Sequence, residues 1–327
     1  MNKKKYIIAS IIMLVIALVS GCFGGQSVRN GEDDPNDTIS VVAVEVDNGA
    51  EEADIATPPE YITIRGEQYS IGLTTLQLVN MDLTNDEIEP LQYMVNLTRL
   101  SLRNNQISDI SPLANLTSLK ELGLSYNQIS DISSLANLTS LTKLTLYDNQ
   151  ISDISPLASL TNLSELWLST NQISDISPLA SLTSLTVLRL YNNQISDISP
   201  LANLTSLTEL SLSTNQISDI SPLANLTGLT RLSLINNQIS DIAPLANLTN
   251  LTELSLSNNQ ISNIAPLANL KGLTRLFLNS NQISDISPFA KLTSSTTLWL
   301  EDNPIAYWSP VQHLPYVYGG RPGGSRP

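Results

Sequence analysis

The fold is decided by residues 105–119, which read NQISDISPLANLTSL and return along the chain every 22 residues. A fixed period of this length is typical of stacked-repeat architectures. We therefore predict that most of the chain forms one solenoid. An asparagine marks each copy of the stretch, at Asn105, Asn127, Asn149, Asn171, Asn193, Asn215, Asn237, Asn259, Asn281 and Asn303.

Each repeat predicts one short strand and one tight helical turn. Leu100 and Leu102 are separated by one residue, which is the alternation of a strand with one buried face. Ser111 followed by Pro112 is typical of an N-cap with proline at the first helical position, but few residues remain before the next strand. One repeat cannot offset the entropy of ordering its own residues, so the repeats must stack and their strands must form a parallel sheet.

The recurring asparagine fits this arrangement. A buried amide has two donors and an acceptor, with which it can satisfy backbone groups in the turn that leaves the strand. We expect the ten asparagines to form a hydrogen-bonded structural ladder.

These motifs resemble the repeats of bacterial leucine-rich-repeat proteins of the internalin type, from about Leu73 to Ile305. The resemblance implies an α/β-type repeat solenoid that is curved, with a parallel β-sheet on the concave face and short helical turns on the convex side. It also implies a binding role, since members of the family often hold ligands on the concave sheet face.

The N-terminus has the features of a secretory signal. Lys3, Lys4 and Lys5 precede an apolar run that is too short to span a membrane. Residues 19–22, Val-Ser-Gly-Cys, resemble the lipobox of bacterial lipoproteins, which implies lipidation at Cys22. The alternative is an incidental cysteine in a signal peptide. We predict a signal peptide at 1–21 and a lipid anchor on the extracellular face of the bacterial cell membrane.

The rest of the chain divides by composition. Residues 22–60 are predicted to be a lipidated N-terminus and an acidic flexible tether. Residues 61–96 are predicted to be an N-terminal cap with an irregular first repeat, because Met81 stands where asparagine is expected. Repeats of 22 residues fill 97–305, and 306–327 form a C-terminal cap and a disordered tail.

Residues between the leucines face outward from the predicted sheet. One outward column alternates in charge, which favours pairing between adjacent strands over ligand contact. It reads Arg99, Glu121, Lys143, Glu165, Val187, Glu209, Arg231, Glu253 and Arg275.

The next two columns contain the candidate ligand-binding residues Tyr147, Trp167, Arg189 and Tyr191. They come from three consecutive repeats, and these residue types dominate interface energetics. Scattered surface aromatic residues are the alternative. Phe277 and Trp299 form a second pair, for which C-terminal capping is an equal explanation.

A further column holds aspartates such as Asp109 and is interrupted by Asn263. Stacked carboxylates could bind calcium, but we favour bonds to the backbone of each turn, a role that asparagine can also fill. The chain has one cysteine and one histidine, so no disulfide framework or zinc site is expected. We predict no metal and no cofactor.

The predicted function is binding without catalysis. No nucleophile pattern or phosphate-binding loop occurs, and a formal charge of −14 argues against nucleic acid as a partner. We expect a protein ligand on the concave sheet face. A carbohydrate or cell-wall binding module is the first alternative, because tyrosine and tryptophan also stack on cell-wall or host glycans, and a passive surface spacer is the second.

Overall fold

The computed structural model describes residues 59–293 and 296–319. The predicted signal peptide, Cys22, the tether up to residue 58 and the tail from residue 320 lie outside the described residues. None of the helices in the described part has the length and apolarity needed to span a bilayer.

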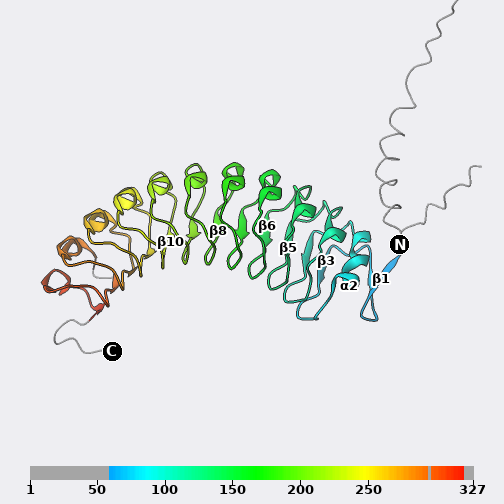
Figure 1. Cartoon of the computed structure of the whole chain (residues 1–327), viewed down its shortest axis with the longest axis horizontal. Helices are drawn as coiled ribbons and strands as arrows, with labels where there is room; N and C mark the ends of the chain where they lie inside the picture. Colours follow the sequence, from blue (N-terminus) through cyan, green and yellow to red (C-terminus); the bar gives the residue numbers. More distant parts are fainter. Residues whose placement is uncertain (1–58, 294–295, 320–327) are drawn as a thin grey trace, which may run out of the picture. The chain divides into compact units, whose positions relative to one another are not determined.

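The described residues form a solenoid built on one parallel sheet of 12 strands, which follow one another in chain order. Figure 1 shows the helical turns as small coils along the outer rim of the arc, with the strands inside that rim. This confirms the predicted repeat solenoid. The strands are β3 (Thr75–Gln77), β4 (Arg99–Ser101), β5 (Glu121–Gly123), β6 (Lys143–Thr145), β7 (Glu165–Trp167), β8 (Val187–Arg189), β9 (Glu209–Ser211), β10 (Arg231–Ser233), β11 (Glu253–Ser255), β12 (Arg275–Phe277), β13 (Thr297–Trp299) and β14 (Tyr316–Tyr318).

Short 3-10 helices return the chain to the next strand. A 3-10 turn rises more steeply than an α-helix, so it covers the return path in few residues. The helices are η1 (Glu89–Tyr93), η2 (Ser111–Leu113), η3 (Ser133–Leu135), η4 (Ser155–Ser159), η5 (Ser177–Ser181), η6 (Ser199–Leu201), η7 (Ser221–Leu223), η8 (Ala243–Asn247), η9 (Ala265–Asn269), η10 (Ser287–Lys291) and η11 (Ser309–Val311).

The predicted N-cap at Ser111 is wrong. Ser111 is the first residue of η2, and the cap position is occupied by Ile110, which has no side-chain bond to offer. Asp109 takes over this role, because its Oδ1 accepts the backbone N–H of Ser111 at 2.8 Å. The aspartate column therefore stabilises the start of the turns.

The core is a continuous stack of leucine and isoleucine. In each strand the central residue points inward, as Leu100 does in β4, and its two neighbours point outward. The strands pair in register, so Leu100 lies beside Leu122 and Leu122 beside Leu144. The residues that flank them therefore form straight outward columns across the sheet.

The asparagines connect consecutive repeats through the backbone. The Oδ1 of Asn193 accepts the N–H of Ile173 at 3.1 Å, and its Nδ2 donates to the carbonyls of Leu168 at 3.1 Å and Leu190 at 3.0 Å. Asn193 is only 9% exposed. The same bonds recur from Asn127 to Asn303, so the column is a ladder in which side-chain amides alternate with backbone groups.

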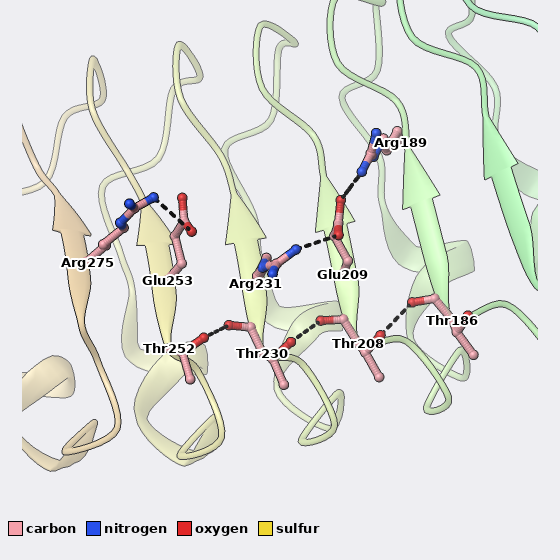
Figure 2. A network of polar contacts seen from close by, with 9 residues as sticks. All are labelled: Thr186, Arg189, Thr208, Glu209, Thr230, Arg231, Thr252, Glu253 and Arg275. Carbon is pink, nitrogen blue, oxygen red and sulfur yellow. Dashed lines mark hydrogen bonds and ion pairs between the residues drawn. The ribbon is translucent and has the colours of Figure 1, made fainter.

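A second ladder crosses the start of the strands and was not predicted. Figure 2 shows Thr208 donating through Oγ1 to the carbonyl of Thr186, and Thr230 donating to Thr208. Thr252 and Thr274 continue the series. The sheet is thus fixed at both ends of its very short strands.

Separate elements cover the two ends of the solenoid. At the N-terminal end β1 (Tyr61–Ile64) and β2 (Glu67–Ser70) form an antiparallel hairpin, followed after β3 by α2 (Asn85–Ile88). Arg65 ties the hairpin to α2, because its Nε lies 2.8 Å from Oε1 of Glu87. At the C-terminal end η11 and β14 continue the repeat pattern beyond residue 305.

Candidate binding surface on the sheet

The structure brings the four predicted ligand-binding residues together. Trp167 and Arg189 are directly paired on β7 and β8, pointing outward. Tyr147 and Tyr191 follow the inward leucines just beyond β6 and β8. A shallow hollow of about 250 Å³ lies among them and is lined by Tyr126, Tyr147, Trp167, Ser169, Arg189 and Tyr191.

Three of the aromatic rings that line this hollow form a contiguous series. Tyr147 meets Tyr126 edge to face, with ring centroids 5.0 Å apart, and lies tilted against Trp167 at 6.2 Å. Such pairs contribute beyond the area that they bury. We call Tyr126, Tyr147, Trp167, Arg189 and Tyr191 the aromatic cluster.

Trp167 is flanked by cations from both neighbouring strands. The guanidinium of Arg189 lies 4.3 Å from the ring centroid, and the Nζ of Lys143 lies 5.1 Å from it. The negative face of the indole attracts both charges. These two contacts favour the observed orientation of the Trp167 ring.

Each of these cations is also held by a carboxylate. Lys143 pairs with Glu165 at 2.7 Å, and Arg189 pairs with Glu209 at 2.7 Å. Figure 2 shows that Glu209 also forms an ion pair with Arg231, at 3.3 Å. These side chains are half-buried at the protein surface, where single ion pairs add modest stability. Their effect here is to orient Arg189.

The other members of the charged column also pair. Arg99 lies 3.1 Å from Glu121, and Arg275 lies 3.9 Å from Glu253. The alternation in the sequence thus corresponds to ion pairs between adjacent strands.

Sequence reasoning missed four residues around the cluster. Ser169 lines the hollow, and Lys143 was assigned only to the charged column. Tyr126 occupies the turn position after β5, where every repeat adopts a left-handed backbone, here with φ of 57°. Arg103 lies over the rings of Tyr126 and Tyr147, with its Cζ 5.2 and 5.7 Å from their centroids.

Three buried polar atoms in or beside the cluster have no hydrogen-bond partner among the residues that the structure describes. They are Nε1 of Trp167 and the hydroxyls of Ser125 and Ser169. Burial also raises the pKa of the Tyr147 hydroxyl, which Arg103 partly counteracts. The free-energy costs of these unpaired buried polar atoms are concentrated at one place on a regular fold, as is common at functional sites.

The second aromatic pair extends into the C-terminal cap. Phe277 and Trp299 stack with centroids 4.1 Å apart, and Trp299 stacks on Tyr318 of β14 at 5.3 Å. The rings link the last three strands of the sheet. This geometry favours capping over a second binding surface.

The aspartates bond to their own turns. Oδ1 of Asp153 accepts the N–H of Ser155 at 2.8 Å, and Asn263 bonds Ala265 in the same way at 3.0 Å. This backbone bond, with help from the serine hydroxyl, lowers the pKa of the carboxyl of Asp153. Within the described residues, no group of three or more His, Cys, Asp or Glu side chains is placed to hold a metal ion.

Comparison with known families defines the class of protein. A family model described as leucine-rich repeats in two copies matches residues 95–137, 139–181, 183–225 and 227–269. A second leucine-rich-repeat model matches residues 249–305. The chain therefore belongs to the leucine-rich-repeat family.

Solved structures refine this assignment. Internalin InlF of Listeria monocytogenes is 38% identical, with a TM-score of 0.67 and coverage of 78% of this chain and 84% of that chain. Internalin InlC2 of the same species is 41% identical over 65% of this chain and 86% of that chain, with a TM-score of 0.48. No curated protein matches the sequence. The repeat region is internalin-like.

A plant receptor is also similar. The leucine-rich-repeat ectodomain of the Arabidopsis receptor kinase HAESA, solved in complex with an extended IDA peptide hormone ligand, is 26% identical. The match covers 66% of this chain and 40% of that chain, with a TM-score of 0.58.

Proposed function

We propose that the chain is a non-enzymatic binding protein, displayed on a bacterial surface and anchored by lipid at Cys22, which recognises a protein through the aromatic cluster. The observation that carries this proposal is the convergence of Tyr147, Trp167, Arg189 and Tyr191 on one hollow of the sheet. Tryptophan, tyrosine and arginine are enriched among the residues that dominate interface energies.

Two features support binding to a protein. The cluster is preorganised, because Arg189 is held by Glu209 and Trp167 by its flanking cations. Preorganised side chains lose little entropy when a partner binds. The HAESA ectodomain, with the same kind of repeat, binds a peptide hormone.

The position of Trp167 favours a protein over a glycan. Sugars stack on free aromatic faces, whereas Lys143 and Arg189 approach the Trp167 ring from the strands on its two sides. The exposed tyrosine rings at the rim, Tyr126 and Tyr191, suit the side chains of a protein surface.

The test is capture by the soluble chain from Gln26 onward, presented with surface proteins and a glycan array together. Trp167→Ala should weaken binding by about 2 kcal/mol, on the order of a thirtyfold loss. Ser211→Ala is the matched control, because Ser211 occupies the same strand position two repeats further on. Its binding should be unchanged.

Unfolding midpoints of both variants separate lost contact from lost stability. If Trp167→Ala leaves the affinity unchanged but substitution of Phe277 and Trp299 lowers it, the binding site lies at the C-terminal end instead. Binding that survives both sets of changes would refute a site on this sheet face.

A further inference from the structure

The outward sheet face is positive although the chain is strongly acidic. The structure describes ten basic residues, and six of them lie in the three outward columns on or just after β3–β14, against five glutamates there. The whole chain has a formal charge of −14. The six are Arg99, Arg103, Lys143, Arg189, Arg231 and Arg275.

Acidic residues collect at the turns instead. Asp109, Asp153 and their equivalents stand at the starts of the 3-10 turns and are exposed. The positive electrostatic potential at the sheet face and the negative potential at the turns orient an approaching charged partner. An acidic segment is attracted to the sheet face and repelled by the turns.

Arg103 is the unpaired cation of this face. Five of the six basic residues lie within 4.0 Å of a carboxylate oxygen. Arg103 has no such ion pair among the described residues, and it is exposed. Its guanidinium rests instead on Tyr126 and Tyr147, at 5.2 and 5.7 Å from the ring centroids. The two rings therefore position the guanidinium of Arg103, while no carboxylate of the described residues neutralises its charge.

A single free guanidinium of this kind suits a carboxylate. Its planar fork donates two parallel hydrogen bonds to the two carboxylate oxygens. A polyanion such as nucleic acid would need a row of free cations, and the neighbours of Arg103 on the sheet face are already paired.

We propose that the partner presents an acidic segment to this face, with one carboxylate on Arg103 and an adjacent aromatic or aliphatic side chain in the hollow beside Trp167. This inference rests on the proposed function. Tyr147 contacts Arg103 and also lines the hollow.

The experiment measures binding of three polymers to the full chain in detergent. The probes are a random copolymer of glutamate and tyrosine, polyglutamate, and a random copolymer of lysine and tyrosine. The acidic copolymer should bind best, because it alone supplies both the carboxylate and the ring. Arg103→Gln should weaken its binding about tenfold, the size of one charge-assisted hydrogen-bonded contact.

Lys271→Gln is the matched control. It removes the same charge from the chain segment after η9, away from the sheet columns, and should leave binding unchanged. Equal binding to the wild type and Arg103→Gln would overturn the proposal, as would equal binding of the lysine copolymer or no binding of any polymer.

A second arm separates this inference from the proposed function. If Trp167→Ala weakens binding of a captured protein but Arg103→Gln does not, the proposal of an acidic segment is refuted and the proposed binding surface stands. If neither Trp167→Ala nor Arg103→Gln weakens binding of that protein, both the acidic-segment proposal and the proposed function are refuted.

Discussion

Two asparagines of the ladder should differ in energetic importance, although both are buried. Oδ1 of Asn105 accepts the N–H groups of Met81 and Leu83, at 3.1 and 3.0 Å. Its Nδ2 donates to the carbonyl of Leu78 at 2.8 Å, the one side-chain bond that this carbonyl receives from the described residues. Asn105→Ala therefore leaves three backbone groups without these partners.

Asn193 occupies the middle of the ladder, where neighbours can compensate. Its Oδ1 accepts one N–H, from Ile173. The carbonyls of Leu168 and Leu190 each also accept a bond from a neighbouring asparagine. Asn193→Ala thus leaves one group unpaired and should cost about 1–3 kcal/mol, whereas Asn105→Ala should cost at least about 3 kcal/mol.

The measurement is equilibrium unfolding in guanidinium chloride, followed by circular dichroism. Both the midpoint and the slope are compared, because long repeat arrays can depart from two-state behaviour. Gln106→Ala is the control, since the Gln106 side chain is exposed beside the ladder. Equal costs for Asn105→Ala and Asn193→Ala, or no cost for either, would refute the reasoning.

Three further predictions concern the anchor and the aspartates. Cys22→Ser should release the protein from the membrane fraction or leave its precursor uncleaved, and unchanged detergent partitioning would contradict lipidation. Millimolar calcium should leave the thermal midpoint unchanged, because the aspartates bond their own turns; a clear rise would reveal a site, since a ligand of the folded state must stabilise it. The lowered pKa of Asp153 means that its contribution is complete above the ordinary aspartate value near 4 and is lost as pH falls through the folded value. Asp153→Asn keeps the acceptor, as Asn263 does, and should reduce acid sensitivity in a denaturant titration between about pH 5 and pH 2.

The repeat period predicted the fold because each apolar position recurs at a fixed distance along the chain. A pair such as Leu100 and Leu102 specifies a strand, and repetition specifies that the strands stack in parallel. The N-terminal hairpin has no such repetition. Its signals were local: Ile62 and Ile64 alternate before Arg65 and Gly66, which both adopt positive φ in the turn.

The candidate binding surface was partly predictable for the same reason. Columns of equivalent positions made Trp167 and Tyr147 stand out against serine, threonine and glycine. Tyr126 was missed because it lies one position beyond those columns, in the left-handed turn. The unpaired state of Arg103 depends on which side chains reach one another, and residue order alone does not determine that.

Small residues in the repeat make room for the large ones. Tyr147 stands between Ser125 and Ser169 in its column, and these serines are only 0% and 1% exposed. Adjacent strands are about 4.8 Å apart, which is too close for three tyrosines to lie flat side by side. The ladders hold this spacing constant from repeat to repeat. A large outward side chain therefore needs small neighbours in its column, and Ser125 and Ser169 provide this space on the two sides of Tyr147.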